Sequence, residues 1–93
     1  QSDTVARVGG DEFIFILNNP KGRDEIRNVA QRIIHSLYEP ITIEDTKLQV
    51  GTSIGVAISP DHGRTSDMLI KNADTAMYTA KSLGQNNLSF FSN

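Results

Sequence analysis

The sequence Gly9-Gly10-Asp11-Glu12-Phe13-Ile14-Phe15-Ile16-Leu17 places two glycines and two acids directly before a run of apolar residues. The apolar run favours a β-strand over residues 12–18, and residues 4–8 have the composition of a second strand. Glycine tolerates a positive φ and has no Cβ, so the glycine pair permits a sharp turn and lets a ligand approach the backbone. The segment therefore predicts a β-hairpin with both acids at its tip, where a divalent cation and a phosphate could meet.

Composition sets the broad class. The chain has 93 residues, 38% hydrophobic and 22% charged, with a net charge of −2 and no cysteine. This describes one small globular domain without a disulfide framework, and it lacks the basic surface typical of nucleic-acid binding. No apolar run approaches the ~20 residues of a membrane span, so direct membrane insertion is not expected. A start at Gln1, almost inside a strand, suggests a fragment of a longer chain.

The segment 23–38 has the pattern of an amphipathic helix. Its apolar residues recur at helical spacing, and they are Ile26, Val29, Ala30, Ile33, Ile34, Leu37 and Tyr38. Asp24 and Glu25 fall in the first turn, where acids favour the helix dipole. Pro40 predicts the end of the helix, because proline disfavours a helical residue before it.

The segment 41–59 is predicted to form a second hairpin. Residues 41–43 alternate, 44–47 read as a polar turn, and 48–59 alternate again. Leu48, Val50, Thr52, Ile54, Val56 and Ile58 would share one face of a half-buried strand.

A second helix and a last strand complete the pattern. Thr65 or Ser66 can cap a helix, and Gly84 suits the position just past its end. The apolar residues between them recur at helical spacing, and they are Leu69, Ala73, Ala76, Met77 and Ala80. With a short strand at 88–91, the order is ββαββαβ, an α+β sandwich with both helices able to pack on one sheet face.

The run from Val5 to Phe13 closely resembles the signature of the GGDEF family, the diguanylate cyclases. Three later segments match the family in order: 53–57, 72–81 and 84–86. The resemblance implies an adenylyl-cyclase-like, ferredoxin-like fold with an antiparallel sheet. In that fold the central first strand precedes the signature, so residues 1–93 would be the C-terminal portion of a partial GGDEF domain. A strand from elsewhere, such as a second copy, would then be expected to fill the gap.

The resemblance also implies an activity. The family condenses two GTP into cyclic di-GMP, releases pyrophosphate, requires Mg²⁺ (or Mn²⁺) and acts as a homodimer. Asp11 and Glu12 match the catalytic, metal-binding acids of the signature; solvated turn carboxylates would give the same local pattern. Gly9 and Gly10 match the glycines beside the nucleotide, although turn geometry alone could require them.

Two positions near the second helix match the family's phosphate contacts. Lys81 matches a lysine that binds the GTP phosphates, but a solvated lysine at a helix end is also favourable. Gln85 stands where many members carry an arginine, and glutamine has neither the charge nor the bidentate fork. Asp3 and Arg32 match parts of an inhibitory product site, or are unrelated surface charges.

The tail 86–93 resembles the junction between a GGDEF domain and an EAL phosphodiesterase domain. A second reading therefore remains open, in which the domain binds GTP and regulates an adjacent EAL or sensor domain. The resemblance implies a bacterial signalling protein of the cytoplasm, whose parent can be membrane-anchored. The 93 residues alone are expected to be inactive, because the upstream metal ligand and the guanine pocket lie outside them.

Overall fold

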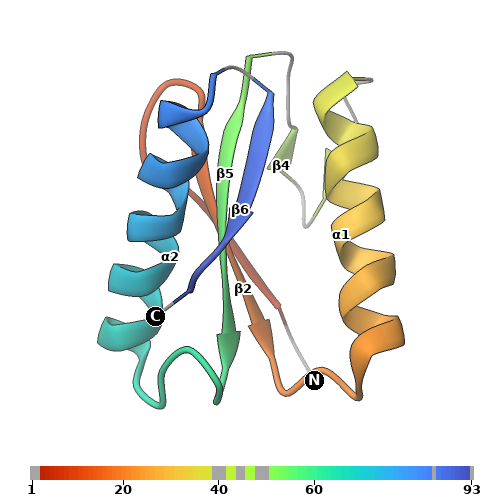
Figure 1. Cartoon of the computed structure of the whole chain (residues 1–93), viewed down its shortest axis with the longest axis vertical. Coiled ribbons are helices and arrows are strands. Elements are labelled where there is room, and N and C mark those ends of the chain that lie inside the picture. Colours follow the sequence, from red (N-terminus) through yellow and green to blue (C-terminus); the bar gives the residue numbers. More distant parts are fainter. Residues whose placement is uncertain (1–2, 39–41, 44–45, 48–50, 85, 93) are drawn as a thin grey trace.

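The computed structural model describes residues 3–38, 42–43, 46–47, 51–84 and 86–92. Figure 1 shows a sheet flanked by two helices. The elements in chain order are β1 (Thr4–Arg7), β2 (Glu12–Asn18), α1 (Arg23–Tyr38), β3 (Thr42–Ile43), β4 (Thr46–Lys47), β5 (Ser53–Ser59), α2 (Ser66–Ser82) and β6 (Asn87–Phe90). The predicted α+β class is confirmed, and so is the order of the elements, except that three strands instead of two lie between the helices. None of the described helices is long and apolar enough to cross a membrane.

The main sheet is mixed, with the strand order β1-β2-β5-β6. The hairpin β1–β2 is antiparallel as predicted, but β2 pairs with β5 in parallel, and so does β5 with β6. The β2–β5 register runs from Glu12 opposite Ser53 to Asn18 opposite Ser59. The expectation of an all-antiparallel sheet with a central gap is therefore wrong for this chain. Direct β2–β5 pairing satisfies backbone groups that a gap would leave open.

The two helices cover opposite faces of the sheet, whereas the sequence suggested one shared face. Alternate residues of a strand point to opposite faces, so each strand supplies two separate cores. The core against α1 contains Phe13, Phe15, Leu17, Ile33, Leu37, Ile54, Val56 and Ile58. The core against α2 contains Ile14, Ile16, Ala57, Leu69, Ala73 and Met77. The apolar run of β2 is continuous because both of its faces are buried.

The strand β5 is buried on both faces, so the prediction of a half-buried strand was wrong. Ile54, Val56 and Ile58 do share one face, against α1, as predicted. The other face carries small residues, and α2 packs directly on it. A Cβ added at Gly55 would overlap the carbonyl oxygen of Ala73 and lie 2.7 Å from the Cα of Met77. Small residues that looked like the solvent side of the strand therefore allow close helix–sheet packing.

Both helices begin and end where the sequence places them. At the start of α1 the Glu25 carboxylate accepts a hydrogen bond from the backbone N–H of Lys21 at 2.7 Å. Thr65 is the N-cap of α2, and its hydroxyl accepts from the N–H of Met68 at 3.2 Å. Gly84 follows the C-cap with a φ of +119°. Every predicted core residue of this helix is buried.

The predicted second hairpin is only partly correct. Thr42 pairs with Lys47 and Ile43 with Thr46, so β3 and β4 form a small antiparallel sheet of their own. The predicted polar turn thus contains strand residues, while β5 joins the main sheet instead of pairing with 41–43. The predicted strand residues 48–50 lie outside the described part of the chain.

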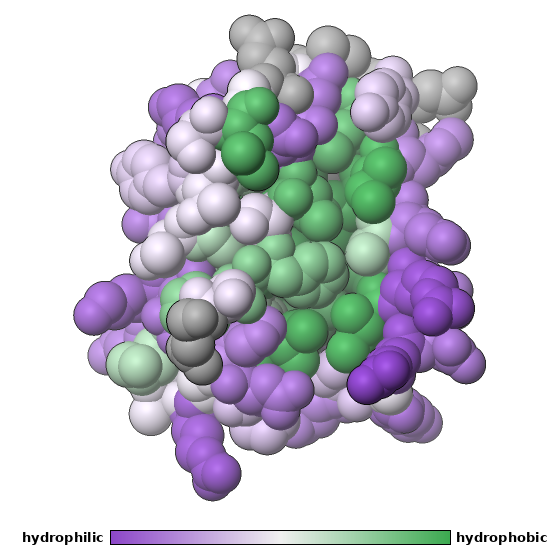
Figure 2. All heavy atoms as spheres, viewed as in Figure 1, coloured by the Kyte–Doolittle hydropathy of each residue, from purple (hydrophilic) through white to green (hydrophobic). Residues whose placement is uncertain are grey.

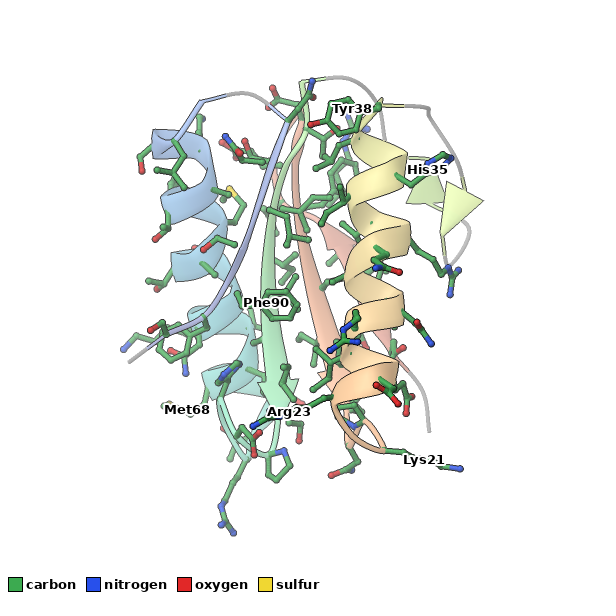
Figure 3. The ribbon with its side chains drawn as sticks, turned by 45° about the vertical axis from the view of Figure 1, so that its right-hand side comes forward. Lys21, Arg23, His35, Tyr38, Met68 and Phe90 are labelled. Carbon is green, nitrogen blue, oxygen red and sulfur yellow. The ribbon has the colours of Figure 1, made fainter. Side chains whose placement is uncertain are left out.

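Part of the core is only partly covered between α1 and the edge strand β6. Figure 2 shows hydrophobic atoms gathered along the middle of this face, with polar residues on both sides. In Figure 3, Phe90 occupies the space between the sheet and α1, while Tyr38 lies at the helix end. Leu88 and Phe90 are only partly buried. The core is therefore dense around β2 and β5 and thinner at this edge.

The close packing of α2 on β5 gives a stability prediction. We expect Gly55→Ala to lower the free energy of unfolding by about 2–3 kcal/mol, because the atoms it would meet are backbone atoms that cannot rotate away. Urea unfolding followed by circular dichroism measures the change. Gly10→Ala is the matched control, since a Cβ there meets nothing within 4 Å. Equal stability of the two variants would contradict the packing argument.

Candidate functional site

The candidate site is the β1–β2 turn, which lies beside the C-terminal end of α2 (Figure 1). The turn closes through the carbonyl of Glu12, which accepts from the N–H groups of Val8 at 2.8 Å and Gly9 at 3.3 Å. The Arg7 guanidinium donates to the carbonyl of Gly9 at 3.0 Å and to that of Gly10 at 2.6 Å. Both glycine carbonyls are thus held by one side chain. Arg7 acts here on the turn backbone, a role the sequence analysis did not identify.

The structure brings two of the predicted site residues together. Lys81 Nζ, in the last turn of α2, donates to Glu12 Oε2 in an ion pair. The Glu12 side chain is 14% exposed and that of Lys81 is 56% exposed. The hydrogen bond and charge of Glu12 raise the pKa of Lys81 above its ordinary value of 10.5, so the ammonium is charged at neutral pH. Residues 69 positions apart in the chain therefore meet at the turn.

Asp11 differs from its neighbour in its surroundings. Its backbone is fixed, because its carbonyl accepts from the N–H of Ser53 at 2.9 Å, next to the first β2–β5 pair. The residue is exposed, and no described residue donates a hydrogen bond to its carboxylate. Asp11 thus presents a free anionic group from a rigid position. Its charge also contributes to the raised pKa of Lys81.

Gly9 and Gly10 differ in the space that surrounds them. A Cβ at Gly9 would overlap Glu12 Oε1 and lie 2.9 Å from Glu12 Cδ, so Gly9 makes room for the carboxylate. A Cβ at Gly10 would meet nothing within 4 Å, and this residue is exposed. Only Gly10 therefore has open space in which a ligand could approach the backbone.

A hydrogen bond also fixes the segment that follows α2. Asn86, which has a φ of +58°, accepts a hydrogen bond from the N–H of Gly51 through its side-chain oxygen. This contact joins the start of β6 to the segment leading into β5. The sequence offered one signal for it, since asparagine tolerates a left-handed backbone better than most residues. The predicted site residue Gln85 lies outside the described residues.

The donor set at the turn suits a hard cation that is shared with a ligand. Among the described residues, no group of three or more His, Cys, Asp or Glu side chains could hold a metal ion. Asp11 and Glu12 supply two carboxylates, and Mg²⁺ is commonly bound by one or two carboxylates together with substrate phosphates. Two carboxylates are fewer ligands than a closed protein site needs, so a hard cation held here would share its coordination with a bound ligand.

The two inhibitory-site candidates lie on separate elements. Asp3 precedes β1 and accepts a hydrogen bond from the N–H of Asn18 at 3.3 Å. Arg32 is exposed on α1. No described contact joins them, and their assignment to a product site stays a prediction.

The space around Gly9 leads to a prediction about Lys81. We expect Gly9→Ala to push the Glu12 carboxylate away from Lys81, so that the pKa of Lys81 falls toward 10.5. The fold should survive, because the displaced group is the end of a flexible side chain. Side-chain NMR of Lys81 across alkaline pH measures the shift. Gly10→Ala should leave the pKa raised, and the same pKa in both variants would contradict this role of Gly9.

Comparison with curated proteins finds close relatives that are much longer. The chain is 37% identical over 89 residues to the "Bifunctional diguanylate cyclase/cyclic di-GMP phosphodiesterase MucR" of Pseudomonas aeruginosa, covering 96% of this chain and 13% of that protein. It is 39% identical over 87 residues to the "Cyclic di-GMP phosphodiesterase PdeR" of Escherichia coli, covering 94% of this chain and 13% of that protein. The chain thus spans about an eighth of the length of these two relatives.

A solved structure and a family model agree with these relatives. The crystal structure of an EAL/GGDEF domain protein from M. capsulatus superimposes with a TM-score of 0.66 at 46% identity, covering 98% of this chain and 59% of that one. The family model described as "Diguanylate cyclase, GGDEF domain" matches residues 1–87. The glycine turn, its two acids and the helix lysine that binds Glu12 all lie within the matched residues, and the chain belongs to the GGDEF family.

Proposed function

We propose that this chain forms the phosphate-binding part of a diguanylate cyclase domain, which condenses two GTP into cyclic di-GMP. The observation that carries the proposal is the meeting of Lys81 with Glu12 beside the exposed carboxylate of Asp11. One cation and two anions at a rigid turn suit a ligand that brings both phosphate oxygens and a bound divalent cation.

The proposed reaction is a double nucleotidyl transfer. The 3′-hydroxyl of each GTP attacks the α-phosphorus of the other, a new P–O bond forms, and the bond to pyrophosphate breaks. Two pyrophosphates leave and two hydroxyl protons are lost. Catalysis of this kind depends mostly on positioning and on stabilising charge in the transition state.

Each site residue has a role in this proposal. Asp11 binds the cation and activates the attacking hydroxyl, and Glu12 is the second acid at the metal. Lys81 binds phosphate oxygens, and Gly10 leaves room for the nucleotide beside the turn. When bound there, Mg²⁺ (or Mn²⁺) would neutralise phosphate charge and lower the pKa of the attacking hydroxyl.

The complete activity belongs to more protein than these 93 residues. The chain covers 59% of the solved EAL/GGDEF domain protein that it superimposes on. We propose that the cyclase acts as a homodimer in which each domain contributes one GTP. The isolated chain is expected to form no product.

A regulatory function is the second candidate. The relative from E. coli is named a cyclic di-GMP phosphodiesterase although it is 39% identical to this chain over 87 residues. In that case the domain would bind GTP without turning it over and would control an adjacent EAL or sensor domain.

The catalytic proposal predicts the effect of removing Asp11. In the complete protein that carries this chain, Asp11→Ala should abolish cyclic di-GMP formation from GTP and Mg²⁺, because the exposed carboxylate is lost while its backbone contacts remain. Product is measured by chromatography and mass spectrometry. Asp61→Ala removes an exposed acid from the loop after β5 and serves as the matched control. Undiminished synthesis by Asp11→Ala would overturn the assignment, and GTP binding without product in the unmodified protein would favour the regulatory function.

A separate prediction concerns Gln85. If this position faces phosphate, Gln85→Arg should tighten GTP binding, because arginine adds a charge and two parallel donors. Calorimetry of GTP binding to the complete protein measures the effect, and unchanged affinity would remove Gln85 from the phosphate site.

A further inference from the structure

The ion pair at the turn joins the two groups that the proposed function assigns to different ligands. Glu12 is assigned to a divalent cation and Lys81 to phosphate, yet each is the other's partner in this structure. A cation on Glu12 would compete with the Lys81 ammonium for the same carboxylate, and a phosphate on Lys81 would compete with Glu12 for the same ammonium. The contact therefore affects how the cation and the phosphate bind. This inference rests on the proposed function.

The two partners are held very differently. Glu12 is fixed through its backbone, whose carbonyl closes the turn, and its side chain lies in the space left by Gly9. Lys81 projects from the last turn of α2, and more than half of its side chain is exposed. A lysine has a long flexible stem and a compact charge, so it can move without disturbing the helix. Glu12 is thus the more restrained partner and Lys81 the more mobile one.

The neighbouring acid has no such partner. The carboxylate of Asp11 is exposed and accepts no hydrogen bond from the described residues. A cation can therefore reach Asp11 directly, whereas it must displace an ammonium group to reach Glu12. The adjacent acids carry equal charge, but only one of them holds Lys81.

We propose that Glu12 is a positioning residue that holds Lys81 at the turn until ligands separate them, so that cation and phosphate binding are positively coupled. A divalent cation on Glu12 releases Lys81 for phosphate. A polyphosphate on Lys81 releases Glu12 for the cation. Each ligand bound alone bears the whole free-energy cost of breaking the ion pair. Two ligands bound together break the pair only once and share that cost. Each ligand therefore binds more tightly in the presence of the other.

The first test uses inorganic triphosphate with a chelator, so that no divalent cation is present. We expect Glu12→Gln to bind triphosphate about fivefold or more tightly than Asp11→Asn does, a ratio at the low end of ordinary coupling. Both variants remove one negative charge from adjacent positions, but only Glu12→Gln frees Lys81. Calorimetry gives the affinities, and amide NMR spectra establish that each variant is folded.

The results separate a specific hold on Lys81 from a general charge effect. Equal affinities in the two variants would overturn the proposal, since charge removal alone would then explain both. Absence of triphosphate binding in every folded variant would overturn it as well, because Lys81 would then not be a phosphate ligand.

A second test needs no substitution and so does not depend on the folding of variants. Adding triphosphate to the unmodified chain in chelator should move the side-chain carboxylate ¹³C signal of Glu12 as its partner leaves, and the corresponding signal of Asp11 should move less. Equal movement of the two signals would contradict the proposal. Neither test measures cyclic di-GMP. The cyclase assignment can therefore fail while the coupling is confirmed, and the coupling can fail while the cyclase assignment is confirmed.

Discussion

The parallel pairing of β2 with β5 is the contact on which the rest of this structure depends. It joins the signature hairpin to the second half of the chain over the full length of both strands. The N–H of Ser53 extends it by donating to the carbonyl of Asp11. Because the register is set by this ladder, the acidic turn and the start of β5 lie at the same end of the sheet. The site therefore exists only because two segments separated by a helix are paired in one register.

This pairing also explains why the chain has two small cores in place of one large core. A parallel connection carries α1 over one face, and α2 packs on the other. A central strand is buried on both faces. In this sheet one face carries large apolar side chains, and the other carries small residues where a helix approaches closely. Gly55 is one of these small residues, since α2 lies too near for any Cβ. Its contribution to function is indirect, because it sets the position of the helix whose last turn carries Lys81.

At the turn, the shape of the backbone and the charges together hold Lys81 beside Glu12. Gly9 leaves space for the Glu12 carboxylate, that carboxylate binds Lys81, and Arg7 holds the glycine carbonyls. The Asp11 carboxylate, which accepts no hydrogen bond from the described residues, remains open to a ligand. Adjacent acids of the same charge thus differ in availability because their surroundings differ.

Much of this protein follows from its sequence by itself. Local signals determined both helices, the caps of α2, the signature hairpin and the buried residues of α2, because capping, periodicity and glycine turns depend on neighbours in the chain. The resemblance to the family also predicted a site with Asp11, Glu12 and Lys81; the structure brings Lys81 to Glu12, and the roles of the three residues remain a proposal. Only the tertiary structure decided which strands pair, that β5 is central, that the helices take opposite faces, and that Glu12 already holds Lys81. The physical reason is that strand pairing and helix–sheet approach are contacts between distant segments, and alternation along a strand is the same whether its small residues face water or a closely packed helix.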